Sequence, residues 1–189
     1  MIIVTGAAGF IGSKLMQALN EQGRTDIIAV DDLTNGHKFS LMAQAECADY
    51  MDQADFLQRI ESNQPFDEPI DVIFHQGACS TTTEWDGKYM MKNNFDYSKS
   101  LLTYATHHHI PFIYASSAAV YGASTCFDDT DPNGQTPLNV YGYSKWLFDC
   151  YVKRHQKQFT APVVGLRYFN VFGPHETYKG SMASVAFHL

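Results

Sequence analysis

The sequence predicts an α/β fold with one open, doubly wound parallel sheet that carries helices on both faces. Short apolar runs of four to six residues alternate along the chain with longer amphipathic segments, and a glycine-rich turn joins the first run to the first amphipathic segment. Strands buried on both faces read as such continuous apolar runs, and parallel strands need helical crossovers that cover the sheet. A chain of 189 residues is long enough for one domain of this kind, but not for two large domains.

The individual elements follow from the apolar pattern and from the Gly, Asp and Ser residues that interrupt it. The strands are expected at Ile2–Thr5, Ile27–Val30, Val72–His75, Phe112–Ala115 and Val163–Arg167. The helices are expected at Phe10–Gln22, Gln53–Ser62, Tyr89–His108 and Val140–Gln158, with a last helix that begins near Ser181.

Composition and charge argue against several classes of protein. The formal net charge of −7 speaks against a nucleic-acid partner, because such a surface needs clustered basic residues. The four cysteines are scattered and the three consecutive histidines at 107–109 point in different directions on a helix, so neither a disulfide framework nor a metal site is expected. No signal peptide or membrane span is read, which predicts a soluble, cytoplasmic protein without a membrane partner.

A glycine motif follows the first expected strand and opens the first expected helix. Gly6 permits a tight turn, Gly9 lets the backbone approach a pyrophosphate, and Gly12 lets the helix pack closely on the strand. The helix N-terminus adds partial positive charge. Asp31 ends the second strand, where it can accept hydrogen bonds from an adenine ribose. This combination predicts a Rossmann domain that binds NAD or NADP.

The residues alone leave the choice between the two dinucleotides open. Asp31 and Asp32 would repel a 2′-phosphate and thereby favour NAD. Lys38 could instead neutralise that phosphate and favour NADP, unless it is an ordinary solvated loop lysine.

A second pattern points to chemistry. Tyr141 and Lys145 are four residues apart in an amphipathic segment, so both side chains lie on one helix face. A nearby ammonium and a positive nicotinamide ring would lower the pKa of the phenol towards neutral pH. Ser116 and Ser117 follow the expected strand Phe112–Ala115, at the edge of the sheet where a hydroxyl could orient a substrate alcohol. These residues predict a catalytic Ser/Tyr/Lys group.

At these residues the sequence resembles an extended short-chain dehydrogenase of the sugar-nucleotide epimerase and dehydratase group. Residues 137–145 are typical of the whole group, whereas residues 75–91 and 167–189 are more specific and are similar to the ADP-L-glycero-D-manno-heptose 6-epimerase family. The resemblance covers the whole chain but only the N-terminal part of the family's usual length. It implies a cofactor domain over residues 1–175, and a substrate-binding region that starts at 176–189 and is largely missing.

The resemblance implies inversion at C6 of ADP-D-glycero-D-manno-heptose through a transient 6-keto intermediate, in lipopolysaccharide inner-core biosynthesis. The implied cofactor is NADP, with NAD as the alternative, and the full-length form is expected to be a homo-oligomer. Tyr141 and Lys179 would be acid/base groups on opposite faces of the sugar, while Ser117 polarises the oxygen and Lys145 supports Tyr141. Two such groups suit an inversion, since protons must move on both faces.

The resemblance also implies the contacts of both ligands. The cofactor contacts are Phe10, Ile11, Asp31, Asp32, Lys38, Gln76, Gly77, Ala78, Cys79, Ser80, Asn93, Lys145, Val171 and Lys179, and the substrate contacts are Ser117, Asn170, Ser181 and His188. Three positions depart from the family pattern: Asp32 stands where an asparagine is usual, Gln53 where a lysine is, and Gln76 where a glutamate is. The first two changes reduce the positive potential near the adenine ribose.

Two alternatives remain beside the heptose epimerase. One is another nucleotide-sugar 4-epimerase or a 4,6-dehydratase, although Ala118 and Ala119 follow Ser117 where a dehydratase of this group carries an Asp-Glu pair. The other is a non-catalytic NAD(P)-binding module, which would not need the Ser/Tyr/Lys group.

Overall fold

The expected sheet is present in the computed structural model, which describes residues 1–174, 176, 183–184 and 186. Six strands lie in the order β3-β2-β1-β4-β5-β6, and every neighbouring pair is parallel. The strand order therefore reverses between β1 and β4, as in a doubly wound fold. The strands are β1 (Ile2–Thr5), β2 (Ile27–Asp31), β3 (Asp49–Asp52), β4 (Val72–His75), β5 (Phe112–Ser117) and β6 (Val163–Tyr168).

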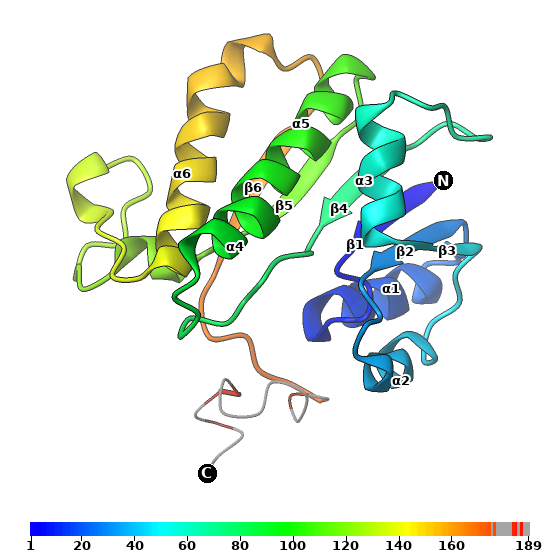
Figure 1. The fold of residues 1–189 in the computed structure, drawn as a ribbon, viewed down its shortest axis with the longest axis horizontal. Helices are drawn as coiled ribbons and strands as arrows, with labels where there is room; N and C mark the ends of the chain where they lie inside the picture. Colours follow the sequence, from blue (N-terminus) through cyan, green and yellow to red (C-terminus); the bar gives the residue numbers. More distant parts are fainter. Residues whose placement is uncertain (175, 177–182, 185, 187–189) are drawn as a thin grey trace.

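Helices cover both faces of the sheet, as expected (Figure 1). One face packs against α3, α5 and α6, and the other packs against α1 and α2. The α-helices are α1 (Phe10–Glu21), α2 (Phe39–Met42), α3 (Gln53–Glu61), α4 (Gly87–Met91), α5 (Tyr97–His107) and α6 (Val140–His155). The part of the chain that the structure describes also contains five short helices: η1 (Gly36–Lys38), the π-helix η2 (Lys92–Asp96), η3 (Ala118–Tyr121), η4 (Pro132–Gly134) and η5 (Gln156–Gln158).

The sequence-based assignment missed one strand and misread one helix. Strand β3 reads Asp49-Tyr50-Met51-Asp52, and this edge strand is too polar for the apolar-run criterion. The helix expected at Tyr89–His108 begins at Gly87, because the Asp86 side chain accepts a hydrogen bond from the Tyr89 N–H at 2.9 Å. It also contains the π-helical segment η2, which apolar periodicity does not reveal. The last helix, expected near Ser181, lies largely outside the described residues.

Two apolar clusters hold the layers together. The larger one joins β-strand residues such as Ile3 and Ile73 to Phe56 of α3, Leu101 of α5 and Phe148 of α6. The smaller one packs strands β1 and β2 against α1 and α2 on the other face. Burial of this apolar surface is the main force that fixes the helices on the sheet.

Neither a membrane-crossing helix nor a metal-type cluster is found in the described part of the chain. No helix there is both long and apolar enough to cross a bilayer. No group of three or more His, Cys, Asp and Glu side chains is placed there to hold a metal ion.

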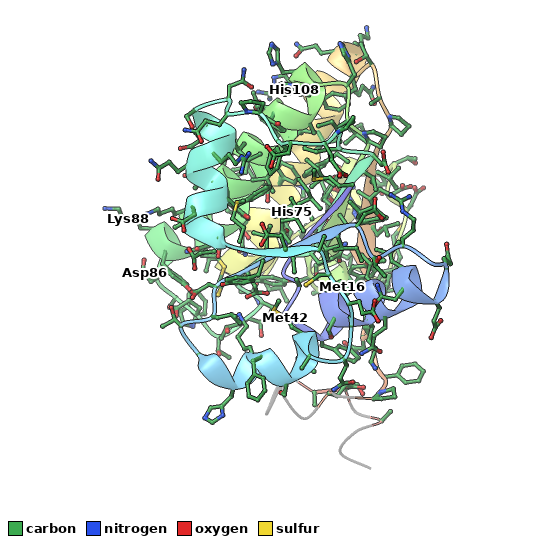
Figure 2. The ribbon with its side chains drawn as sticks, turned by 90° about the vertical axis from the view of Figure 1, so that its right-hand side faces the viewer. Met16, Met42, His75, Asp86, Lys88 and His108 are labelled. Carbon is green, nitrogen blue, oxygen red and sulfur yellow. The ribbon has the colours of Figure 1, made fainter. Side chains whose placement is uncertain are left out.

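A buried histidine connects the centre of the sheet to helix α5 (Figure 2). The Nδ1 atom of His75 lies 2.7 Å from the Thr5 hydroxyl, and its Nε2 atom lies 2.8 Å from the Ser98 hydroxyl. Ser98 donates its proton to the backbone carbonyl of Asn94 in η2, so Nε2 must donate and Nδ1 must accept. His75 is therefore neutral, and it links β1, β4 and the π-helix.

This buried histidine predicts a loss of stability in acid. Burial, aided by the charge of Lys145, lowers the pKa of His75 from its ordinary 6.5 to about 3. Between these values the unfolded chain binds more protons than the folded chain, so the free energy of unfolding falls as the pH drops below 6.5. His75 should lower the free energy of unfolding by about 1.4 kcal/mol for each pH unit below 6.5, which amounts to a loss of about 2 kcal/mol at pH 5.

Urea unfolding at pH 7, 6 and 5 tests this expectation by comparing the native protein with His75→Gln. The carboxylates titrate in both proteins, so the difference in slope isolates His75. We expect the variant to be less stable at pH 7 but to lose less stability on acidification. Equal slopes in the two proteins would contradict a neutral, buried His75.

Candidate functional site

The glycine turn lies where strands β1 and β4 diverge. Gly6 has a φ of 69°, and a Cβ atom there would lie 2.6 Å from the backbone N of Gly77 in the loop after β4. A Cβ atom at Gly12 would lie 2.1 Å from the Gly6 carbonyl oxygen. Both positions therefore require glycine, one for a left-handed turn and one for the close approach of α1 to that turn.

Helix α1 points its N-terminus into this turn and suits a pyrophosphate. Its N-cap is Gly9, which provides no side-chain cap, and its first turn contains no acidic residue. The partial positive charge of the helix end is thus not neutralised by a side chain. A cavity of about 360 Å³ lies beside this helix and is lined by Phe10, Ile11 and Val171, three of the expected cofactor contacts. The turn, the helix end and the cavity fit a dinucleotide.

The end of β2 forms the corner where an adenine ribose is expected. The Asp31 carboxylate is buried, accepts a 2.8 Å hydrogen bond from the Ala8 N–H and contacts the Lys38 ammonium. Lys38 also donates to the backbone carbonyl of Asp32 at 2.7 Å. It is therefore not a solvated loop lysine, because two of its three protons are already bound within this corner.

Acidic side chains outnumber basic ones in this corner. Asp52 of β3 lies beside Asp31 in the parallel register, and Tyr50 donates a 3.0 Å hydrogen bond to the Asp31 carbonyl. Burial first, and then the charges of Asp52, Asp31 and Asp32, raise the pKa of Tyr50, so all three carboxylates act on one hydroxyl. Hydrogen bonds from Thr34 lower the pKa of Asp32, which keeps it ionised. Among the described residues of this corner, the Lys38 ammonium is paired with Asp31, and its charge also acts on Asp32.

The loop after β4 contains the expected cofactor contacts 76–80 and is held by a residue that the sequence analysis did not select. Asn94 is fully buried in η2. Its side chain accepts from the Cys79 N–H at 2.8 Å and donates to the Cys79 carbonyl at 2.9 Å, and it also lies 3.1 Å from the Ser144 hydroxyl of α6. The neighbouring Asn93, a predicted cofactor contact, donates to the Tyr89 carbonyl at 2.8 Å, and its role toward cofactor stays a prediction. Asn94 thus ties the loop to the catalytic helix.

Helix α6 begins directly against the segment that follows β5. Asn139 caps the helix by accepting a 2.8 Å hydrogen bond from the Gly142 N–H. A Cβ atom at Gly142 would lie 2.7 Å from the Ala119 carbonyl oxygen, so glycine permits this close contact. Ser117 in turn accepts from the Ala119 N–H at 3.1 Å. The first turn of α6 therefore brings Tyr141 close to Ser117, which acts on the pKa of the phenol.

Burial shifts the ionisation of the two helix residues. Burial raises the pKa of Tyr141, and Ser117 opposes this rise only in part. Desolvation of the phenolate is the largest effect on this group, whereas the expected lowering involved a bound nicotinamide as well as the ammonium and stays a prediction. Burial also lowers the pKa of Lys145 from 10.5 to about 8. The Lys145 ammonium donates a 2.9 Å hydrogen bond to the Ala115 carbonyl of β5.

The remaining predicted residues divide into two sets. Asn170 is exposed just after β6, at the same edge of the sheet as Ser117. Lys179, Ser181 and His188 lie outside the described residues, so their predicted roles stay predictions.

A third residue on the face of Tyr141 and Lys145 was missed: Asp149, one further turn along α6, accepts hydrogen bonds from Ser116 and Arg167. The four-residue spacing was the signal that could have indicated it.

Comparison with known proteins agrees with this arrangement. A solved structure of ADP-L-glycero-D-manno-heptose-6-epimerase from Helicobacter pylori is 34% identical, has a TM-score of 0.84, and is matched over 100% of this chain and 60% of that chain. UDP-glucose 4-epimerase from Brucella ovis, in complex with NAD, is 26% identical with a TM-score of 0.72 over 93% of this chain and 54% of its own. UDP-glucuronic acid 4-epimerase from Bacillus cereus, solved with UDP-glucuronic acid and NAD, is 29% identical with a TM-score of 0.74 over 92% and 57%.

This chain thus spans less than two thirds of the chains that it resembles in structure. The model of the NAD dependent epimerase/dehydratase family matches residues 2–189. The glycine turn, the acidic ribose corner and the Ser117–Tyr141–Lys145 group lie within that match, and the chain belongs to the NAD dependent epimerase/dehydratase family.

Proposed function

We propose that this protein inverts C6 of ADP-D-glycero-D-manno-heptose to give ADP-L-glycero-D-manno-heptose. The observation that carries the proposal is the placement of Ser117, Tyr141 and Lys145 at the same sheet edge as the glycine turn. The choice of sugar is supported by the identity of 34% to the Helicobacter pylori heptose epimerase over the whole of this chain.

The chain's own residues would bind, orient and move protons. The glycine turn and the α1 N-terminus would hold the pyrophosphate, and the bound dinucleotide would accept and return the hydride. The Ser117 hydroxyl would donate a hydrogen bond to the C6 oxygen of the sugar. Tyr141 as a phenolate would take the proton from the C6 hydroxyl of the sugar. Lys145 lies one helical turn away and would stabilise the phenolate by its charge. We assign the proton transfer on the opposite face to Lys179.

The wider assignment rests on the same proposal. Residues 1–175 would form the cofactor domain, and residues 176–189 would begin the region that binds the sugar nucleotide. Asn170, Ser181 and His188 would contact the substrate. We further propose a cytoplasmic homo-oligomer that supplies the heptose of the lipopolysaccharide inner core.

Conversion of the heptose tests the proposal directly. The protein is incubated with ADP-D-glycero-D-manno-heptose and NAD⁺ or NADP⁺, and the two epimers are separated by chromatography. Tyr141→Phe should slow the conversion by about 10²–10⁴-fold, because general acid–base catalysis contributes that much. Tyr143→Phe is the matched control: it lies on the same helix, but its side chain is exposed and its ring packs at a tilt against that of Trp146. This control should convert the heptose at the native rate.

Three results would overturn the assignment. Conversion of UDP-galactose in place of the heptose would make the protein a 4-epimerase like several of its structural relatives. Binding of dinucleotide without conversion of either sugar would favour a non-catalytic module. A fully active Tyr141→Phe variant would remove Tyr141 from the chemistry even if the heptose is converted.

The preferred dinucleotide is a separate part of the proposal. Resemblance implies NADP, but we propose that NAD binds more tightly, because a 2′-phosphate would meet Asp31, Asp32 and Asp52, and Lys38, the basic side chain that the described residues place there, is already paired with Asp31. NAD⁺ should bind about tenfold or more tightly than NADP⁺ in titrations followed by fluorescence or calorimetry. The combined change Asp32→Asn and Gln53→Lys should reduce or reverse this ratio by strengthening NADP⁺ binding, more strongly at low salt.

Asp128→Asn provides the control for net charge. Asp128 is exposed in the segment between β5 and α6, and this segment lies on the side of the molecule away from β2 and β3 (Figure 1), so removing its charge should leave the ratio unchanged. Equal or tighter binding of NADP⁺ by the native protein would contradict the proposed preference for NAD.

A further inference from the structure

We propose that Asp149 is a positioning residue of the catalytic group: it keeps Lys145 charged, and it locks the ends of strands β5 and β6 to helix α6. The inference rests on the proposed function, because it assigns a role beneath the Ser117–Tyr141–Lys145 group. It concerns a residue that contacts neither substrate nor cofactor and acts only through its neighbours.

The Asp149 carboxylate collects three hydrogen bonds from two strands. Its Oδ1 atom accepts from the Tyr114 hydroxyl at 3.0 Å. Its Oδ2 atom accepts from the Ser116 hydroxyl at 2.8 Å and from Nε of Arg167 at 3.0 Å. The side chains of Asp149 and Arg167 are only 12% and 15% exposed, so this charge pair is largely removed from water. Several donors from two strands therefore hold this carboxylate in one position.

The fold makes room for one of these donors at a specific glycine. Tyr114 of β5 is paired in register with Gly165 of β6. A Cβ atom at Gly165 would lie 2.4 Å from the Tyr114 hydroxyl oxygen, so any other residue would force the phenol away from its present place. The contact of Tyr114 with Asp149 is therefore built into two strands, and it is not a chance surface encounter.

Arg167 connects the hydrogen-bonded group around Asp149 to the segment that follows Ser117 in the chain. Its Nη2 atom donates to the Gln135 side chain at 3.1 Å, and its guanidinium lies 4.9 Å from the centre of the Tyr121 ring. Tyr121 belongs to η3, which begins immediately after Ser117. Ser116, a direct partner of Asp149, precedes Ser117 in the chain. Asp149 is thus connected to both sides of Ser117.

Charge gives Asp149 its second role. Lys145 lies one turn before it on α6 and is buried. Burial lowers the pKa of Lys145 to about 8, while the charges of Asp149 and Cys79 raise it. The other titratable groups near the ammonium are the neutral His75 of β4 and Tyr141 of its own helix. Among these groups, Asp149 contributes the largest charge effect that holds the proton on Lys145 at neutral pH.

Titration of Lys145 provides a direct test that does not depend on turnover. The pKa is read from the 13C shift of the lysine Cε in the full protein, with the signal assigned through Lys145→Met. We expect Asp149→Asn to lower the midpoint by about one pH unit, a tenfold change in the proton affinity of Lys145. Asp149→Glu should restore most of the shift. Tyr114→Phe removes one hydrogen bond of the cluster but no charge, and it should leave the midpoint unchanged.

The pH dependence of epimerisation gives the second readout. Because Lys145 acts as a cation, kcat should fall as the pH rises through its pKa, and in Asp149→Asn this fall should begin about one pH unit lower. If Asp149→Asn does not fold, the double variant Asp149→Asn/Arg167→Met removes both charges of the pair and should show a smaller shift in the same direction, because the loss of the more distant guanidinium offsets only part of the effect. An unchanged Lys145 midpoint in either variant would overturn the inference. A shifted midpoint in a protein that converts no heptose would instead refute only the proposed function.

Discussion

A buried ammonium connects the parts of this site. Lys145 lies within helix α6, donates a hydrogen bond to the Ala115 carbonyl of β5, and has its positive charge opposed by desolvation and supported by Asp149. Burying a charge is costly unless it is hydrogen-bonded and paired. The protein meets that requirement by packing α6 so closely that Gly142 contacts the Ala119 carbonyl. The same packing places Tyr141 beside Ser117, so the geometry of catalysis and the accommodation of the lysine have one structural cause.

The sheet topology explains why this group meets the dinucleotide. All strands are parallel, so their carboxyl ends lie at one edge, and the reversal of strand order between β1 and β4 leaves a crevice there. The glycine turn follows β1, and the Asn94-tied loop follows β4. His75 of β4 is hydrogen-bonded to Thr5 of β1 and to Ser98 of α5. The ends of β1 and β4 are thus linked to helix α6 by one chain of buried polar contacts, which passes through η2.

Sequence patterns predicted the fold well wherever an element is apolar or is marked by glycine. Strands such as Ile2–Thr5 and Val72–His75 appear as predicted, and Gly6 and Gly12 lie where the turn requires them. Strand β3 was missed because its pairing with β2 is invisible in a polar four-residue segment. Asn94 and Arg167 could not be predicted, since their roles arise from contacts between segments far apart in the sequence. The raised pKa of Tyr141 likewise depends on burial, which residue spacing does not report.

The central claim is that Ser117, Tyr141 and Lys145 face the reactive end of a dinucleotide held by the glycine turn. A crystal structure of the protein with bound NAD⁺ measures this most directly. The account predicts that the pyrophosphate lies on the α1 N-terminus and that the Lys145 ammonium hydrogen-bonds the nicotinamide ribose. The Tyr141 hydroxyl should then lie within a few ångströms of the nicotinamide ring. A nicotinamide that points away from β5, with Tyr141 and Ser117 sealed off from it, would contradict the account.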